Sequence, residues 1–288
     1  MPYVSATEMI QAAKKGRYAI GHFNLNNMES IRAYLLAAEE MKSPVILGVS
    51  GGTAKYMGGY KTITATVTSF IDYLKIGVPV ALHVDHGTYA EVLDAIESGF
   101  SSVMFDGSAL PIEENLEKSR YILGLCREKG ISLECEVGAI GGEEDGVASM
   151  GECADPADCA KMAELGIDML AAGIGNIHGK YPKDWPGLRF DVLEEICNVT
   201  NGLPLVLHGG SQIPEDQVKR AISMGVCKVN VNTECQLAFT EGVRKYIEEG
   251  KDLTSKGFTP RALLAPGLEA SKEVAIKKMQ LFGSVNKA

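Results

Sequence analysis

The segment HVDH, which follows an apolar run at 78–82, places His83, Asp85 and His86 at the end of a predicted strand. A short apolar, β-branched run of this kind is typical of a buried strand. Imidazole and carboxylate groups at such a position either form a hydrogen-bonded cluster that caps the core or carry out chemistry. The segment alone leaves both interpretations open, so the positions of the other histidines have to separate them.

The chain contains only five histidines. Three of them, His86, His178 and His208, lie at or just after the ends of the third, sixth and seventh apolar segments. In a closed barrel these ends meet at one rim, and three neutral imidazoles with an open fourth position form a catalytic zinc site. Asp85 is then either a proton-transfer group beside the open position or a support for its neighbour. For the remaining histidines, His22 and His83, we expect structural or supporting roles.

Apolar segments alternate along the whole chain with stretches of helical periodicity. Eight of them are predicted strands, at 18–24, 44–50, 79–85, 101–106, 131–137, 166–175, 203–209 and 226–232. The clearest predicted helices are 27–42, 88–99, 111–130 and 213–225. Eight strand–helix units without a linker predict a single TIM (β/α)8 barrel domain over residues 1–288, with an extra C-terminal helix after Gly257.

A doubly wound sheet would show the same alternation, but its glycine-rich fingerprint would follow the first strand. The corresponding segment here reads GHFNLNN. Nearly every predicted strand instead ends in a polar residue, as expected for a barrel whose chemistry gathers at one end. These residues are Asn24, Ser50, Asp85, Asp106, Glu136, His208, Asn230 and Asn232, and His178 follows the sixth strand.

Two glycine-rich segments follow proposed metal ligands, NIHGKY at 176–181 and LHGGSQIPE at 207–215. Glycine amides can approach an anion closely, and the second segment leads into a predicted helix whose N-terminus attracts negative charge. The segment VNVNTE at 229–234 adds Asn and Thr side chains. Phosphate sites in TIM barrels often use the loops after strands seven and eight, although each segment alone is also compatible with an ordinary tight turn.

The composition favours small-molecule ligands. A formal net charge of −9 and a pI near 5.2 argue against a nucleic-acid surface or a basic membrane-binding face. The sequence shows neither a signal-peptide pattern nor an apolar run of the roughly 20 residues that a membrane-spanning helix needs. Seven scattered cysteines without a CxxC pair do not form a disulfide framework, so we expect a reducing, cytoplasmic location.

The sequence resembles the class II, zinc-dependent fructose-bisphosphate aldolases and their tagatose-bisphosphate relatives. Six motifs carry the resemblance, in matching order and spacing over nearly the whole chain: LHVDHG, SVMFDGS, ECEVGAIGGEEDG, IGNIHGKYP, LVLHGGS and KVNVNTE. It implies a glycolytic or gluconeogenic lyase that reversibly cleaves fructose 1,6-bisphosphate to dihydroxyacetone phosphate and glyceraldehyde 3-phosphate. Zinc would stabilise the enediolate that forms when the C–C bond breaks. The alternative substrate is tagatose 1,6-bisphosphate or a related ketose phosphate.

The resemblance also implies roles for individual residues. Zinc would bind His86, His178 and His208, and Asp106 and Glu136 would lie near a position that the metal occupies before substrate arrives. Asp85 would exchange a proton with the C4 hydroxyl, and Glu144 would handle the C3 proton. The implied substrate-binding residues are Asn24, Ser50, Gly179, Gly209, Gly210, Ser211, Asn230, Asn232 and Thr233. A monovalent cation, Na⁺ or K⁺, would lie near Gly179 and Ser211. For the assembly, we expect a homodimer or homotetramer.

Two departures from the family pattern stand out. Gln212 replaces a glycine of the phosphate loop, and Asn232 stands where some relatives carry an aspartate associated with the choice of hexose bisphosphate. The preferred C4 epimer therefore stays open. The alternative functions are a Schiff-base aldolase using Lys228, a zinc hydrolase and a metal-binding module without turnover. The glycine-rich, acidic segment 138–151 is expected to be a mobile lid without a packed element of its own.

Overall fold

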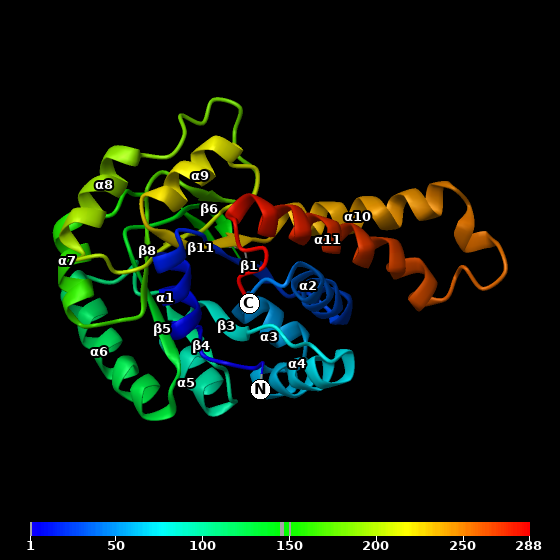
Figure 1. Cartoon of the computed structure of the whole chain (residues 1–288), viewed down its shortest axis with the longest axis horizontal. Coiled ribbons are helices and arrows are strands. Elements are labelled where there is room, and N and C mark those ends of the chain that lie inside the picture. The colour runs from blue at the N-terminus through cyan, green and yellow to red at the C-terminus, as the bar shows by residue number, and fades with distance from the viewer. Residues whose placement is uncertain (1, 145–146, 150) are drawn as a thin grey trace.

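Eight parallel strands close into a barrel in the computed structural model, which describes residues 2–144, 147–149 and 151–288 (Figure 1). Around the barrel their order is β1-β11-β10-β8-β5-β4-β3-β2. Their bounds are β1 Ile20–Asn24, β2 Val45–Val49, β3 Val80–Gly87, β4 Ser102–Phe105, β5 Ser132–Val137, β8 Met169–Ala172, β10 Leu205–Leu207 and β11 Val226–Val231. Each coincides with a predicted strand, and the expected TIM barrel is confirmed.

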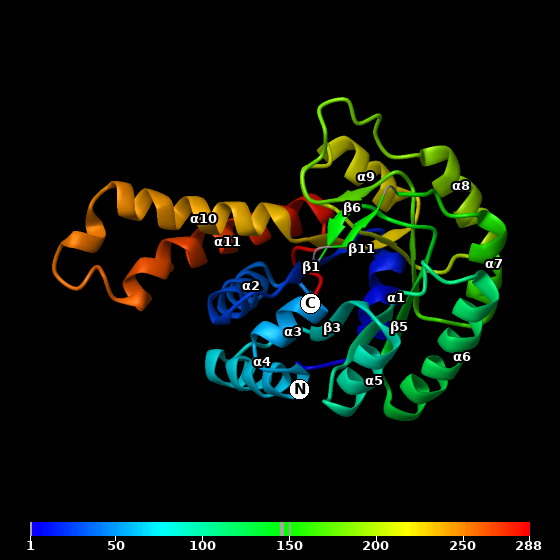
Figure 2. The ribbon, with the colours of Figure 1, turned by 180° about the vertical axis from the view of Figure 1, so that it is seen from behind.

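Helices surround this barrel (Figures 1 and 2). They are α1 Ala6–Gly16, α2 Met28–Met41, α3 Gly51–Tyr56, α4 Tyr60–Leu74, α5 Tyr89–Glu97, α6 Ile112–Lys129, α7 Pro156–Glu164, α8 Phe190–Val199, α9 Glu215–Ser223, α10 Thr233–Glu248 and α11 Pro260–Phe282, with the 3-10 turn η1 Lys251–Leu253. The predicted extra C-terminal helix is α11. Together α10, η1 and α11 form an arm whose two helices lie side by side and extend away from the barrel (Figures 1 and 2). Within the described residues, every helix is too short or too polar to cross a bilayer.

The interior of the barrel is apolar at one end and polar at the other. Strand residues at the apolar end pack against one face of α1; they include Ile20, Ile46, Ala81, Met104, Met169 and Val206. Alternate residues of a strand point to the same face, so the interior continues two and four residues further along. Those positions hold His22 and Asn24 on β1, and His83 and Asp85 on β3. The strand period therefore delivers polar side chains to the C-terminal end of the barrel.

A small second sheet lies beside that end, and its strands β7, β6 and β9 are Val147–Ser149, Gly141–Glu144 and Ile177–His178. The segment 138–151 is not expected to form a packed element unaided, and here β6 pairs with β7 and also with β9 from outside the segment. Gly142 lies opposite His178 with a φ of 92°, and a Cβ atom there would lie 2.2 Å from the His178 carbonyl oxygen. Residues 145, 146 and 150 are outside the described part of the chain, and lid mobility stays a prediction.

Candidate active site

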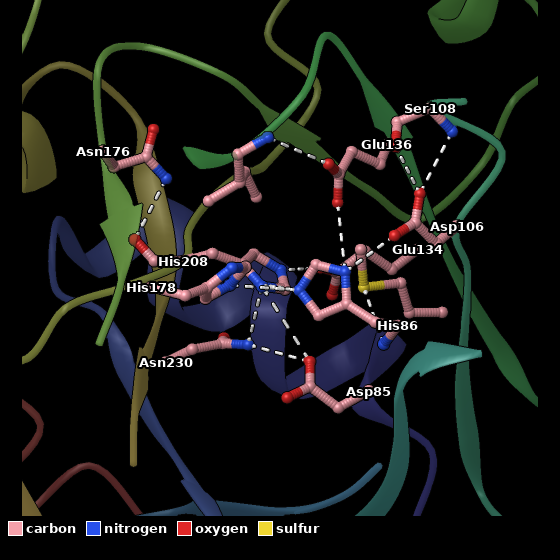
Figure 3. A network of polar contacts seen from close by, with 12 residues as sticks. Asp85, His86, Asp106, Ser108, Glu134, Glu136, Asn176, His178, His208 and Asn230 are labelled. Carbon is pink, nitrogen blue, oxygen red and sulfur yellow. Dashed lines mark hydrogen bonds and ion pairs between the residues drawn. The ribbon is translucent and has the colours of Figure 1, made fainter. Parts of the chain in front are cut away.

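The end of β3 presents two adjacent polar side chains to the same site. In a regular strand Asp85 and His86 would face opposite sides. However, His86 has a φ of 48°, and the pairing of β3 with β4 shifts register between Val84 and Gly87. A positive φ is uncommon for a residue other than glycine. This local change allows both Asp85 and His86 to reach the mouth of the barrel (Figure 3).

The three histidines predicted as metal ligands converge at this mouth. His86 Nε2 lies 3.2 Å from His178 Nε2 and 2.9 Å from His208 Nδ1 (Figure 3). Nitrogen atoms bound to one tetrahedral zinc ion are roughly 3.3 Å apart, given metal–nitrogen bonds of about 2.0–2.1 Å. The donor set and its spacing therefore fit one metal ion held by three imidazoles.

Two of these imidazoles are held in the neutral form that a metal ligand requires. Burial, followed by the nearby charge of His86, lowers the pKa of His178 to about 4. The same two causes, with Lys228 adding to them, hold the pKa of His208 well below its ordinary value. Burial also lowers the pKa of His86, but a hydrogen bond with Asp106 and the charge of Glu136 prevail and raise it to about 10. A metal ion has to displace the His86 proton on binding.

Asp106 and Glu136 lie on the other side of the His86 ring. His86 Nδ1 is 2.8 Å from Asp106 Oδ2 and 3.4 Å from Glu136 Oε2. Burial, and then the charge of Asp106, raises the pKa of Glu136 to about 8. The ligand atoms of these three residues all lie within 4.8 Å of one another, as the predicted second metal position requires.

Asp85 is buried and held by two amides. Asn24 Nδ2 donates to its Oδ2 at 2.7 Å, and Asn230 Nδ2 donates to its Oδ1 at 3.1 Å. Burial raises the pKa of Asp85, but the nearby histidines, His22 first, prevail and hold it well below its ordinary value. Asp85 is therefore a carboxylate, able to accept a proton. Both asparagines are predicted substrate-binding residues, and their contacts with Asp85 join strands that no local sequence pattern relates.

Nine of the predicted residues line one small pocket: Asn24, Asp85, His178, Gly179, Gly209, Ser211, Asn230, Asn232 and Thr233. Gly209 has a φ of 64°, and a Cβ atom there would lie 2.0 Å from the Ile177 carbonyl oxygen. Among the described residues, Asn232 Oδ1 is buried without a hydrogen-bond partner. The cavity measures about 20 Å³, enough for one water molecule, so a phosphate requires the lining groups to move apart.

Some predicted residues are placed differently. Ser50 caps α3 by accepting from Thr53 N at 3.3 Å, and the Gly210 amide donates to the Asn230 carbonyl at 2.8 Å. Neither lines the pocket. Gln212 adopts a φ of 65°, the left-handed conformation that a glycine adopts readily. The backbone of Glu144 pairs with Val147 in the β6–β7 hairpin, but its side chain lies outside the described part of the structure.

Comparisons with known proteins agree with this arrangement. The family model for class-II fructose-bisphosphate aldolases matches residues 4–287. The chain is 53% identical over 282 residues to a fructose-bisphosphate aldolase of Mycoplasma genitalium, covering 97% of this chain and 98% of that one. It is 50% identical over 293 residues to a fructose-bisphosphate aldolase of Streptococcus pyogenes, and the match covers 100% of both chains.

Solved structures are similar as well. The crystal structure of the YdjI aldolase from Escherichia coli K12 matches with a TM-score of 0.84 and 31% identity, covering 99% of both chains. That of a fructose-bisphosphate aldolase from Campylobacter jejuni matches with a TM-score of 0.82 and 28% identity, covering 99% of this chain and 97% of that one. The barrel and site thus define a metal-dependent aldolase. The chain belongs to the class-II fructose-bisphosphate aldolase family.

Proposed function

We propose that this protein reversibly cleaves fructose 1,6-bisphosphate to dihydroxyacetone phosphate and glyceraldehyde 3-phosphate. One observation carries the proposal: three histidine nitrogens converge beside a buried carboxylate, with Asp85 Oδ1 only 3.9 Å from His208 Nδ1. The glycine-lined pocket beside them offers the loops for a phosphate once its lining groups move apart, and relatives about 50% identical are named for this activity. Tagatose 1,6-bisphosphate or a related ketose phosphate is the alternative substrate.

We propose that the resident metal is Zn²⁺, held by His86, His178 and His208. When bound, it supplies a Lewis acid that stabilises negative charge developing on the ketone oxygen of the substrate. A donor set of three imidazoles is typical of catalytic zinc. Asp106 and Glu136 would offer ligands at a second position, and a monovalent cation, Na⁺ or K⁺, would lie near the phosphate loops.

Asp85 would accept the proton of the C4 hydroxyl during cleavage and return it during condensation. The amides of Asn24 and Asn230 favour its ionised form and fix the direction of its oxygens. Glu144 would move the proton at C3, which requires the β6–β7 hairpin to act as the predicted lid. Normal cleavage and normal C3 proton exchange in Glu144→Gln would exclude that role.

The phosphate of the dihydroxyacetone half would bind the loops that contain Gly179, Gly209 and Ser211. Asn232 and Thr233 would contact the rest of the substrate from the start of α10. The buried Asn232 Oδ1 atom can accept a hydrogen bond there. Gly210 and Ser50 would act through the shape of their loops, because their hydrogen-bonding groups are used within the protein.

The assembly and its setting are also proposals. We propose a single barrel domain over residues 1–288 that forms a homodimer or homotetramer through the arm, where Leu253 and Phe258 are 84% and 68% exposed. Apolar side chains exposed to this degree are typical of surfaces that a partner covers. All seven cysteines are free, which supports a reducing cytoplasm.

A coupled assay of both bisphosphates on one zinc-loaded preparation tests the function. Cleavage should be abolished by a chelator, restored by Zn²⁺ and unaffected by borohydride. Buried Lys228 lies 2.8 Å from Glu134, an arrangement that disfavours a Schiff base. Covalent trapping at Lys228, or cleavage that persists without metal, would overturn the proposal. The ratio of the cleavage rates of fructose and tagatose 1,6-bisphosphate shows which C4 epimer the enzyme prefers.

A further inference from the structure

Two fully buried charged side chains lie inside the barrel beneath the proposed metal site. Lys228 Nζ, on β11, lies 2.8 Å from Glu134 Oε2, on β5, and both side chains are 0% exposed. The strands β8 and β10 separate β5 from β11 in the barrel, so the ion pair crosses the interior. Burying two charges costs free energy that the pair does not always recover. This cost suggests a role beyond packing.

The second oxygen of Glu134 connects the ion pair to a proposed ligand. Glu134 Oε1 lies 2.8 Å from His208 Nε2. A carboxylate can only accept, so Nε2 of His208 carries the hydrogen and Nδ1 keeps its lone pair. Nδ1 is the atom that lies 2.9 Å from His86 Nε2, and Asn230 Nδ2 approaches it as a donor at 3.2 Å. Contacts at both ring nitrogens favour the tautomer that can bind a metal through Nδ1 (Figure 3).

Lys228 holds the carboxylate in the orientation that this contact needs. Its ammonium lies 2.8 Å from Glu134 Oε2 and 3.5 Å from the Nε2 atom of His83, which itself lies 3.5 Å from Glu134 Oε2. His83 is fixed in turn by a 2.6 Å contact between its Nδ1 atom and Ser102 Oγ. The chain of contacts therefore runs from β4 through β3 and β11 to β5, and ends on His208.

We propose that Lys228 is a positioning residue: by holding Glu134, it fixes His208 in the tautomer and ring orientation that metal binding requires. Residues that contact a ligand and not the metal, as Glu134 does, typically contribute 10- to 100-fold to metal affinity. The inference rests on the metal site of the proposed function.

A double-mutant cycle on the metal-free full-length protein tests the inference. In Glu134→Gln, the Lys228 ammonium should attract the amide oxygen and turn the NH₂ group toward His208. The His208 Nε2 atom then has to accept, its hydrogen moves to Nδ1, and the metal-binding lone pair is lost. Adding Lys228→Met removes the ammonium and lets the amide turn round, which restores an acceptor to Nε2.

Zn²⁺ affinity is measured by competition with a chromophoric chelator. Glu134→Gln should weaken binding about 10- to 100-fold and Lys228→Met should weaken it by a smaller factor, while the double variant should bind more tightly than Glu134→Gln alone. Nitrogen-15 NMR gives an independent readout, since only five histidines contribute signals. His208 should be protonated at Nε2 in the wild type and at Nδ1 in Glu134→Gln.

Lys278→Met is the matched control, because Lys278 is also largely buried and its Nζ lies 2.7 Å from Glu234 Oε2, a carboxylate that accepts from the Gln212 backbone amide and not from a histidine. Its Zn²⁺ affinity should equal that of the wild type. Wild-type affinity in Lys228→Met, or a double variant no tighter than Glu134→Gln, would overturn the inference. If Lys228→Met does not fold, the comparison of the double variant with Glu134→Gln still tests the inference. A wild type that binds no Zn²⁺ would instead refute the metal site itself.

Discussion

Replacing Asp85 by Asn separates proton transfer at C4 from every other part of the proposed reaction. Both carboxylate oxygens accept from amide donors, at 2.7 Å from Asn24 and at 3.1 Å from Asn230. The new NH₂ group therefore faces a donor on one side. A buried donor without an acceptor costs about 1–3 kcal/mol. A protein with a typical stability of about 5–15 kcal/mol still folds at this cost.

The effect on catalysis should be larger. Loss of a positioned acid/base lowers the rate by roughly 10²- to 10⁴-fold, which corresponds to about 2.7–5.4 kcal/mol at 1.36 kcal/mol per factor of ten. Bisphosphate cleavage in Asp85→Asn should fall by this amount. Exchange of the dihydroxyacetone phosphate C3 proton with solvent should fall far less, because the histidines, the phosphate loops and Glu144 are unchanged. Zinc content should match the wild type.

Asp168→Asn is the matched control for this change. Asp168 also accepts on both oxygens, at 2.9 Å from Thr7 Oγ1 and at 2.9 Å from Leu133 N, but at the opposite end of the barrel. Its variant should lose similar stability and keep both rates. If Asp85→Asn loses zinc, Asp85 supports the metal site; if cleavage and exchange fall equally with zinc retained, the division of labour between Asp85 and Glu144 is refuted.

Four further results are expected. His178→Ala and His208→Ala should each lose metal and activity together, and stoichiometric zinc in both would refute the ligand assignment. Gly142→Ala should weaken metal binding, because its Cβ would lie 2.2 Å from the His178 carbonyl oxygen; unchanged zinc affinity by chelator competition would contradict this. Glu144→Gln should lose C3 proton exchange. Gln212→Gly should leave the melting temperature unchanged or slightly higher. A φ of 65° is unfavourable for Gln by about 1–2 kcal/mol, but this gain is offset because glycine loses more entropy on folding. A clear drop in melting temperature would mean that the Gln212 side chain stabilises the loop.

The barrel was predictable because its signals are local. Each of the eight strands is a short apolar segment, and the period of two places His22 and Asn24, or His83 and Asp85, on one face. The three-histidine cluster followed once the strand ends were assumed to meet at one rim. The sequence does not predict which ring nitrogen of each histidine faces the metal, because the choice between Nδ1 and Nε2 depends on partners from distant strands.

Other features depend on contacts that no local pattern encodes. The β6–β7 hairpin forms in a segment of glycines and acids because β9, more than 30 residues later, offers a pairing edge. The left-handed backbone at His86 lies within β3 but one residue past the predicted end of that strand. The ion pair of Lys228 and Glu134 joins strands that are neighbours neither in the sequence nor in the sheet.

The division of the barrel interior into an apolar and a polar end has a consequence for engineering. Ile20 and Val206 belong to the apolar cluster at α1, whereas Asn24 follows Ile20 by four residues and His208 follows Val206 by two. Two strand residues span about 6.6 Å, enough to keep a volume-conserving exchange at the first pair out of contact with the chemistry at the second. Heat tolerance can therefore be selected at the apolar end of the barrel while substrate preference is varied at the polar end. Substitutions selected separately at the two ends should have nearly additive effects when they are combined.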